Sequence, residues 1–558
     1  NNGPTSTLSS GSKAAHNDAW LQVTVAKYLP RNTLNETTVS VAGSVDSNDP
    51  YLGLPAANVL VASQLVDGGV GISMLRAGGS GGGHGDTKTW TTELKNQTTY
   101  NTWDRHHTVA LTFDATLDGY STQQDAGFGS FFFNSLADFA AGAPASYSRT
   151  LTGLHTTGSG FNGAIGLGDT FNPNTPITGP LAFGFVPPPP KPTFQYGVRL
   201  EGNQIGAHPA YNREVDSLFG VRTDHSPGGV RLMPMVGFNW PLFGTFKSNG
   251  LSLGWRALLS GGIREYRGPF ATRSIDSYTR QTGLPSAIQQ LYCVGAATPL
   301  PDWQAFEQGE SFVPTQCANG GSAASTPLAQ TAPPVALFSP DYTVSDSWRP
   351  ALNFSYTINS MFRASLNGTW ALNRDLPSAY DLNFNPAARF SLVSEAGRPI
   401  YVTPTSIVPS TGTESWTDSR VSPDFAHVSE SRSDLRSQVR SMGATLFYSP
   451  SFFFGGPGGG FTNGSVTYTH NDAREQYRGF QSTAGDPRDV AWSVSGMAKH
   501  VVTLNVSRYQ NNWGNVTVQG RFQSGARYTP SVSGDINGDG YATDRAFVFD
   551  PQAAGTDT

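Results

Sequence analysis

Residues 107–118 read HTVALTFDATLD, and this stretch decides the fold class. Apolar side chains occupy every second position from Val109 to Leu117, and threonine or aspartate occupies most of the positions between them. Successive side chains of a β-strand point to opposite faces of its sheet, whereas a helix would repeat its apolar face every three to four residues. The segment is therefore predicted to be a strand with one apolar and one polar face.

The same alternation recurs along the whole chain, whereas helical periodicity is hard to find. Each run is about 8 to 12 residues long, which suits a tilted strand that crosses a bilayer. The runs predict about 14 strands. They lie near residues 18–27, 36–46, 90–100, 107–119, 160–169, 192–202, 232–241, 250–260, 351–359, 361–373, 436–449, 462–473, 498–508 and 514–523.

The links between these strands alternate between short and long. Short links include residues 101–106 and 359–360, and residues 170–191 form a longer member of the same set. The other links are long, and the longest covers residues 261–350. Outer-membrane barrels show this pattern, with tight periplasmic turns and large extracellular loops. The spacing therefore predicts an all-β fold, a transmembrane antiparallel β-barrel with long extracellular loops.

Composition limits the alternatives. The 558 residues carry 14% charged side chains and a formal net charge of −5, with 63 glycines and 38 prolines. Soluble domains usually carry about 25% charged residues, and a nucleic-acid-binding surface would be basic. No apolar run is long enough for a transmembrane helix. A soluble β-rich surface or adhesin domain remains the alternative fold, and a β-solenoid is disfavoured because no short sequence repeat is visible.

Several segments, spread in order along residues 32–551, resemble the Oar-like TonB-dependent transporters of the bacterial outer membrane. They are NTLNE (32–36), NDPYLGLPA (48–56), GFGSFFFNSLADF (127–139), FQYGVRLE (194–201), PAYN (209–212), FGVRTD (219–224), VGFNW (236–240), YCVG (292–295), PTQC (314–317), SGDINGDGY (533–541) and DRAF (544–547).

The resemblance implies a 22-stranded barrel that is energised from the inner membrane through the TonB complex and gated by a plug. About fourteen strands, with no plug or TonB box before the first one and no terminal aromatic residue at Thr558, predict that residues 1–558 form part of such a barrel. The last strands are expected beyond Thr558. The expected location is the outer membrane of a Gram-negative-type bacterium, in contact with its lipid and lipopolysaccharide.

Both cysteines, Cys293 and Cys317, lie in the longest loop. In an oxidising compartment, two cysteines this close in sequence most simply form a disulfide. Two free thiols are the alternative, and a zinc site is disfavoured because the loop contains no histidine.

A calcium site is predicted in the last loop, where DINGDG (535–540) reproduces the opening of an EF-hand-type loop. Asp535, Asn537 and Asp539 supply oxygen ligands at positions one, three and five, and Tyr541 offers its backbone carbonyl at position seven. The usual glutamate at position twelve is missing, and Asp544 at position ten is the nearest substitute. A turn rich in Asp, Asn and Gly without an ion is the alternative.

No convincing catalytic set is visible, so the chain is not expected to be an enzyme. Gly78-Gly-Ser-Gly-Gly82 matches G-x-S-x-G, but a nucleophile elbow needs a strand before it and a helix after it, and the sequence suggests neither. His106 and His107 are neighbours at a predicted periplasmic turn, and consecutive strand residues face opposite sides, so this pair would not converge on one metal ion.

The leading functional hypothesis is a TonB-dependent transporter or receptor of an unidentified substrate. The second is a surface-exposed structural or adhesive outer-membrane protein that acts through its large loops, and a secreted β-rich enzyme is a third. No nucleic acid is expected among the partners.

Overall fold

The computed structural model describes most of the chain. The residues outside this description are 1–4, 65–69, 175–190, 249–250, 319–321, 324–325, 328, 331, 360, 408–413, 450–460, 482–484, 511–513, 533 and 549–558. Most of the longer link at residues 170–191 thus lies outside the described residues.

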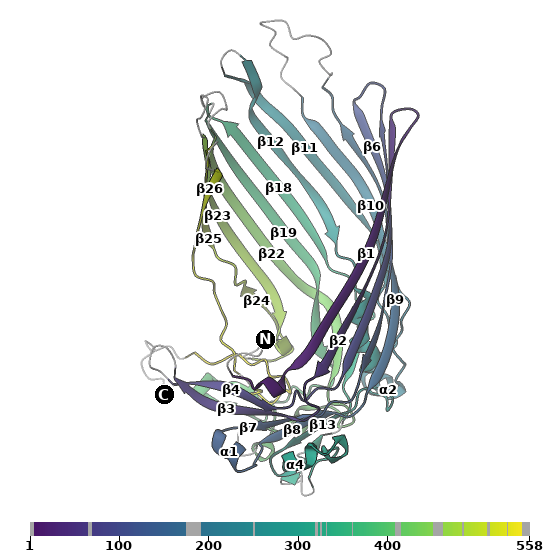
Figure 1. Cartoon of the computed structure of the whole chain (residues 1–558), viewed down its shortest axis with the longest axis vertical. Coiled ribbons are helices and arrows are strands. Elements are labelled where there is room, and N and C mark those ends of the chain that lie inside the picture. Colours follow the sequence, from purple (N-terminus) through teal and green to yellow (C-terminus); the bar gives the residue numbers. More distant parts are fainter. Residues whose placement is uncertain are drawn as a thin grey trace.

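The largest element is a 16-stranded sheet, here called the wall (Figure 1). Fourteen strands follow one another in a single path, and β17 and β24 pair at its sides. The path is β1 (Ser12–Leu29), β2 (Thr33–Pro50), β5 (Gly85–Asn101), β6 (His107–Gln124), β9 (Leu154–Phe171), β10 (Thr193–Ile205), β11 (Gly229–Ser248), β12 (Leu251–Arg267), β18 (Asp346–Thr357), β19 (Phe362–Asp381), β22 (Val428–Tyr448), β23 (Phe461–Arg478), β25 (His500–Gln510) and β26 (Gly514–Gln523).

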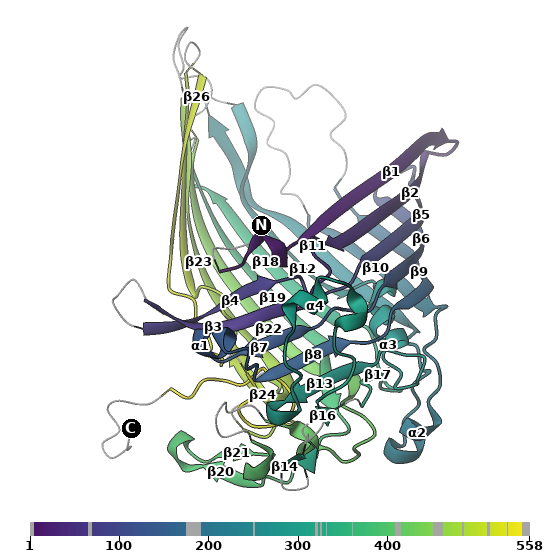
Figure 2. The ribbon, with the colours of Figure 1, turned by 60° about the horizontal axis from the view of Figure 1, so that its bottom comes forward.

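Each strand of the path pairs antiparallel with its neighbours, and every predicted strand range overlaps one of them. The sheet curves into a trough with strongly tilted strands (Figures 1 and 2). In the part of the chain that the structure describes, the path ends at β1 on one side and at β26 on the other. The fold-class prediction is confirmed: the chain is all-β, with an antiparallel wall of barrel type.

The long links fold into a second layer, here called the cap, which crosses the lower end of the trough in Figure 1 (see also Figure 2). Its centre is a six-stranded sheet in the order β16-β13-β8-β7-β3-β4. These strands are β3 (Ala56–Gln64), β4 (Val70–Gly78), β7 (Ser130–Phe133), β8 (Ser146–Thr150), β13 (Gln290–Val294) and β16 (Ala329–Gln330). The sequence did not predict this sheet.

The cap has its own hydrophobic core. Phe131, Phe133 and Tyr147 are fully buried, and Leu291 is almost so. The rings of Phe131 and Tyr147 lie 4.4 Å apart, and Trp303 meets Phe131 edge-on at 5.8 Å. Buried aromatic side chains contribute large apolar areas and favourable ring geometry. Loop segments far apart in sequence therefore form one packed unit.

The remaining elements are short. The helices are α1 (Leu136–Ala140), α2 (Arg213–Phe219), α3 (Asp276–Arg280) and α4 (Trp303–Phe306), and the single 3-10 turns are Leu8–Ser10, Thr272–Ile275, Gly295–Ala297, Glu310–Phe312, Val393–Glu395, Pro404–Ser406, Trp416–Ser419 and Gly479–Gln481. The other strands are β14 (Ser322–Ala323), β15 (Thr326–Pro327), β17 (Val335–Phe338), β20 (Phe390–Leu392), β21 (Arg398–Ile400) and β24 (Val490–Val494). Among the residues described, no helix is long and apolar enough to cross a membrane.

Candidate functional site

One face of the wall is apolar across every strand of the path. Directly paired residues of neighbouring strands share a face, so the register can be followed from β1 to β26. Leu111, for example, pairs with Leu167, which pairs with Val198. Leu111 and Phe113 are 46% and 43% exposed, so no part of the described chain covers them. We call this surface the outer face.

The outer face carries an apolar residue or several on each strand. They include Leu21, Val23 and Val25 of β1; Val39, Val41 and Val45 of β2; Trp90 and Leu94 of β5; Leu111, Phe113 and Leu117 of β6; Phe161, Ile165 and Leu167 of β9; Tyr196, Val198 and Leu200 of β10; Leu232, Val236 and Trp240 of β11; Leu259 and Ile263 of β12; Leu352 and Phe354 of β18; Leu366, Trp370 and Leu372 of β19; Met442 and Leu446 of β22; Val466 and Tyr468 of β23; Val502 and Leu504 of β25; and Val516, Val518 and Phe522 of β26.

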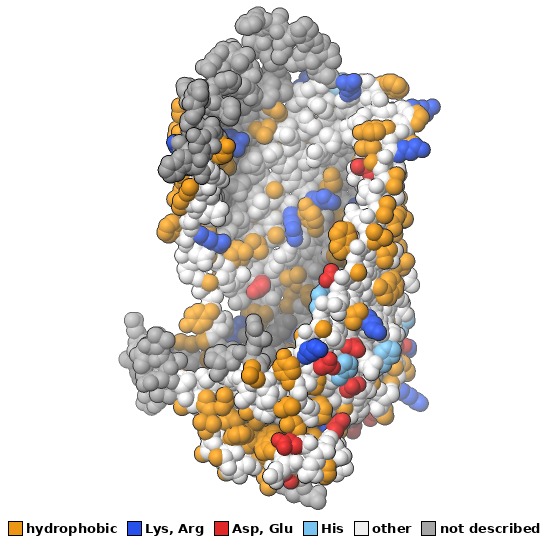
Figure 3. Space-filling model, in the orientation of Figure 1, with side chains coloured by type: hydrophobic (Ala, Val, Ile, Leu, Met, Phe, Trp, Pro, Cys, Tyr) orange, Lys and Arg blue, Asp and Glu red, His pale blue; other side chains and the backbone are white. Residues whose placement is uncertain are grey.

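The opposite, inner face is polar. Cross-strand hydroxyl contacts join Thr24 to Thr38 at 3.0 Å and Thr445 to Thr467 at 3.0 Å. Arg199 pairs with Asp114 at 2.7 Å across β6, β9 and β10. Figure 3 shows the contrast: hydrophobic side chains line the outer edge of the trough on the right, whereas its visible interior is mostly uncharged polar surface and backbone with scattered charges.

An ion network ties four strands together where the wall meets the cap. Arg231 of β11 contacts Glu265 of β12 at 2.9 Å and Asp346 of β18 at 2.5 Å. Arg374 of β19 contacts the same two carboxylates at 3.4 and 2.9 Å. Asp346 is 2% exposed and Glu265 is 4% exposed, so both buried charges need these partners. Sequence reasoning missed this network, because its members are isolated charges on four different strands.

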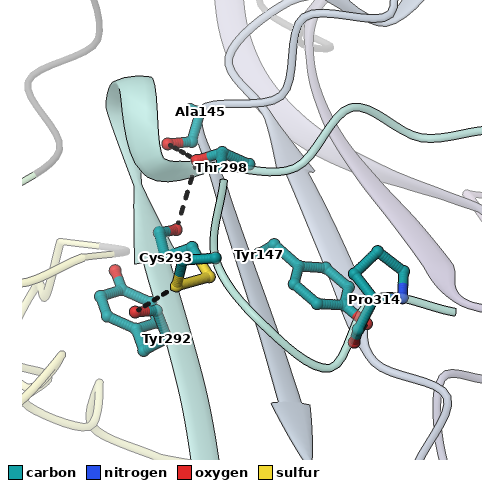
Figure 4. The surroundings of a disulfide bond; sticks show 7 residues. Ala145, Tyr147, Tyr292, Cys293, Thr298 and Pro314 are labelled. Atoms are coloured by element: carbon teal, nitrogen blue, oxygen red, sulfur yellow. Dashed lines mark hydrogen bonds between the residues drawn. A yellow bond between two sulfur atoms is a disulfide. The ribbon is translucent and has the colours of Figure 1, made fainter. Parts of the chain in front are cut away.

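The predicted disulfide is present. The sulfur atoms of Cys293 and Cys317 are bonded, and their Cα atoms lie 5.6 Å apart (Figure 4). Cys293 belongs to β13 in the cap sheet, and Cys317 lies in the segment that follows α4. The bond therefore fastens a surface segment to the core of the cap.

Two buried polar side chains of β8 hold the same segment. The Tyr147 hydroxyl donates to the Pro314 carbonyl at 3.1 Å, and burial raises the pKa of this phenol. Arg149 donates to the carbonyls of Gly127 at 2.7 Å and Val313 at 2.8 Å, and its guanidinium pairs with Glu310 at 3.1 Å. The arginine side chain is only 4% exposed, whereas Glu310 is 54% exposed.

The predicted calcium loop is an ordered turn closed by its own side chains. Asp535 Oδ1 accepts the Gly538 N–H at 2.7 Å, and its Oδ2 accepts the Gly540 N–H at 2.6 Å. Asp544 Oδ2 accepts the Ile536 N–H at 2.6 Å. Asx hydrogen bonds of this kind shape a turn with or without an ion. These hydrogen bonds hold the backbone around Asp535, Asn537, Asp539 and Asp544 in one compact turn.

A residue that the sequence did not indicate joins this group. Glu414, from the link between β19 and β22, interacts electrostatically with Asp535, Asp544 and Asp539. Burial, and then repulsion from Asp535, raises the pKa of Glu414 to about 8. Burial and neighbouring carboxylates likewise raise the pKa of Asp535 to about 7 and that of Asp539 to about 8. Burial and mutual repulsion thus disfavour the ionised forms of these three carboxyl groups.

Two arginines dock the loop. Arg420 donates to the Asp539 carbonyl at 2.8 Å, and Arg398 lies 3.6 Å from Asp544 Oδ1. That oxygen is buried and accepts no hydrogen bond. No group of three or more His, Cys, Asp or Glu side chains within the described residues is arranged to hold a metal ion. The loop in this structure is therefore a docked turn in which Asp544 Oδ1 has an ion pair with Arg398 but no hydrogen bond.

The structure gives the G-x-S-x-G match and the two adjacent histidines ordinary structural surroundings. In the G-x-S-x-G match, a strand does precede Ser80, because β4 ends at Gly78; the sequence did not suggest this strand. The next described element is β5 and not the helix that a nucleophile elbow needs. His107 pairs with Asp169 at 2.7 Å, whereas His106 contacts the Asn172 carbonyl at 2.7 Å. The two imidazoles thus have separate partners.

Neither a protein-family profile nor a curated protein matches the chain. Among solved structures, it is similar to the outer membrane transporter YddB from Escherichia coli, with 10% identity, a TM-score of 0.49, and coverage of 92% of this chain and 52% of that one. It is also similar to the siderophore receptor PirA from Acinetobacter baumannii, with 8% identity, a TM-score of 0.38, and coverage of 91% and 55%. The chain thus spans about half the length of these proteins, and at such values the likeness decides neither activity nor substrate.

Proposed function

We propose that the chain is the barrel region of a TonB-dependent transporter or receptor in the outer membrane of a Gram-negative-type bacterium. One observation carries the membrane part of this proposal: the apolar outer face runs unbroken across the fourteen strands of the path, opposite a polar inner face. In a bilayer, strands must pair all their backbone groups and present apolar side chains to lipid. In water, such a face would be a very large exposed patch.

The transport part rests on the resemblance of residues 32–551 to Oar-like transporters. A polar inner face suits a lumen that a hydrated substrate and a plug share. The cap lies at the end of the wall with the long links, which in outer-membrane barrels is the extracellular end, so it is placed to meet a substrate first. The TonB complex is the partner implied at the opposite end.

Membrane localisation is tested by fractionation and detergent dependence. The protein should sediment with the outer membrane and aggregate when detergent is withdrawn. A chain that stays monodisperse without detergent would refute the barrel. Transport is tested separately, by comparing which nutrients from spent medium the host takes up with and without the gene, in strains with and without TonB. Loss of one uptake activity in both single mutants is expected.

The alternative is a surface-exposed structural or adhesive role. The disulfide and the separate core of the cap favour it, because a packed surface unit is also what adhesion needs. Membrane localisation without any TonB-dependent uptake, together with loss of cell attachment on deletion of the gene, would favour this role over transport.

We also propose that the loop at residues 535–544 binds calcium, with Glu414 supplying the carboxylate that position twelve lacks. The observations in support are the oxygen-only donor set of Asp535, Asn537, Asp539 and Asp544, the Asp544 oxygen that accepts no hydrogen bond, and the mutual repulsion of the buried carboxylates of Glu414, Asp535 and Asp539. Hard oxygen ligands suit calcium, and extracellular sites tolerate weak affinity.

Calcium titration of the purified protein in detergent tests this proposal. Calcium should protect the loop from protease, and magnesium should do so less, because magnesium demands a stricter geometry. Asp539→Asn and Glu414→Gln should both weaken the protection. An unchanged digestion pattern in millimolar calcium would leave the loop as a turn without an ion.

A further inference from the structure

A groove of about 500 Å³ opens on the outer face between β18, β19 and β22. Its floor is Gly368, where an added Cβ would meet no atom within 4 Å. Leu352, Leu366, Trp370 and Met442 border it, and each is between 43% and 57% exposed. The missing side chain at Gly368 leaves a slot in an otherwise even apolar surface.

Arginines lie on the same face, on the cap side of this groove. Arg440 pairs directly with Trp370, one outer-face position beyond Met442. Further along β22, Arg436 is exposed between the buried Leu435 and Ser437. On β23, Arg474 pairs with Gln438 and donates to its side chain at 3.0 Å. From Met442 toward the turns the outer-face residues of β22 are apolar, whereas on its cap side β22 presents Arg440, Gln438 and Arg436. Apolar side chains continue beside them on the neighbouring strands, with Leu372 opposite Gln438 and Val494 of β24 opposite Arg474. The arginines thus lie within the cap-side part of the apolar surface.

The acidic side chains nearby leave a net positive charge. Asp434 is engaged by Arg478, and Glu430 by Arg432 at 2.6 Å. Asp472 lies opposite Arg440 in the register, yet no ion pair within 4 Å joins them among the residues described. Three arginines thus share one unpaired aspartate.

We propose, on the basis of the proposed function, that this surface binds a phosphate-bearing lipid of the cap-side leaflet, with an acyl chain in the Gly368 groove and a phosphate on Arg440, Arg436 and Arg474. Arginine binds phosphate oxygens with paired, charge-assisted hydrogen bonds, and basic pockets at a membrane boundary bind lipid head groups. If the cap is extracellular, that leaflet carries lipopolysaccharide, so we commit to its lipid A part as the occupant.

The arrangement of the two features supports this choice over a soluble ligand. A groove on the lipid-facing side of the wall is reached only through the membrane, which excludes a peptide or a free metabolite. A groove without nearby charge would accept an acyl chain of any lipid. Because arginines lie at the cap-side end of this groove, a lipid with a phosphate at that depth of the bilayer should bind more tightly than one without.

Native mass spectrometry of the delipidated protein in detergent, with added lipid A, tests the proposal. The unaltered chain should retain lipid A in preference to phosphatidylcholine, and the double variant Arg436→Gln/Arg440→Gln should retain it about tenfold less, as expected for the loss of about 1.4 kcal/mol of binding free energy. Arg521→Gln is the matched control, because Arg521 lies on the inner face, where it contacts Gln523 at 3.0 Å. Its retention should match the unaltered chain.

The groove is tested in the same way by Gly368→Leu, which should reduce retention by filling the slot. Ala364→Leu, on the same strand and face but outside the groove, is its control. Equal retention by all variants, or equal retention of phosphatidylcholine, would overturn the lipid site while leaving the barrel intact. A chain that needs no detergent would instead overturn the proposed function.

Discussion

At the scale of single residues, Arg149 determines how the cap holds its disulfide-bearing segment. Replacing it with methionine should leave the buried Gly127 and Val313 carbonyls without a donor, which costs about 1–3 kcal/mol for each group left unsatisfied. Protease cleavage of the segment between Glu310 and Cys317, measured at increasing denaturant concentration, should show the loss. Glu310→Gln should cost less than about 1 kcal/mol, because that carboxylate is half exposed. Equal costs for the two variants would contradict the assignment.

Asp418 should make the cap sensitive to acid. Burial alone would raise its pKa, but hydrogen bonds from Ser406 at 2.6 Å and from the Thr403 hydroxyl at 2.7 Å, with the Thr403 amide, outweigh burial and lower it. Because the folded pKa lies below the unfolded value of about 3.9, the stabilisation is present above that pH and is lost as the pH falls through the folded pKa.

Amide exchange of Thr403, measured between pH 6 and pH 3, checks this expectation. Protection in the unaltered protein should fall toward the acid end, and Asp418→Asn should remove that part of the pH dependence. Asp341→Asn serves as the control, because Asp341 is an exposed carboxylate in the turn after β17. An identical pH profile for Asp418→Asn and the unaltered chain would show that the three donors do not favour the ionised form.

The residues of the candidate sites were only partly predictable. The pairing of Cys293 with Cys317 could be predicted, because they are the two cysteines of the chain and lie in one predicted loop. The loop at residues 535–544 could be proposed as a site, because its oxygen-bearing side chains are close together in the sequence. The involvement of Glu414 could not be predicted. It interacts with Asp535 from a link more than a hundred residues earlier, and nothing in the sequence around Glu414 indicates this interaction.

At the scale of the strand, β6 offers the sharpest test of the two faces. Phe113→Arg would place a charge on the outer face near the middle of the apolar run, and such a charge costs about 2–4 kcal/mol at the bilayer midplane. Thr116→Arg, on the inner face opposite Glu93, should be tolerated. The fraction of protein that assembles into a heat-modifiable, protease-resistant form in the outer membrane measures both. Equal assembly would mean that the faces are wrongly assigned.

Strands of the wall and strands of the cap differ in how much their own sequence reveals. Apolar and polar residues alternate along β6 and β26, so each strand can be predicted from its own sequence without knowledge of its neighbours. β7 has four residues and β13 has five, and their partners come from other links of the chain. A strand that short has too few alternations to be distinguished from a loop, so the cap sheet became visible only in the structure.

At the scale of the whole molecule, the wall separates two ends of different character. The tight turns lie at one end, such as residues 102–106 between β5 and β6, and the disulfide-linked cap lies at the other. Disulfides persist in oxidising surroundings, and long loops of outer-membrane barrels face outward, so both observations predict an extracellular cap.

Cysteine labelling of living cells tests this orientation. Val393 of the cap is 90% exposed, and Trp103 of a tight turn is 76% exposed, whereas the two native cysteines are bonded to each other and do not react with maleimide. Val393→Cys should be labelled in intact cells by a maleimide that cannot cross the membrane. Trp103→Cys should be labelled only after the outer membrane is permeabilised. The reverse pattern would invert the proposed orientation, and the arginines beside the Gly368 groove would then face the leaflet without lipopolysaccharide. Labelling of both Val393→Cys and Trp103→Cys in intact cells would mean that the wall does not span the membrane.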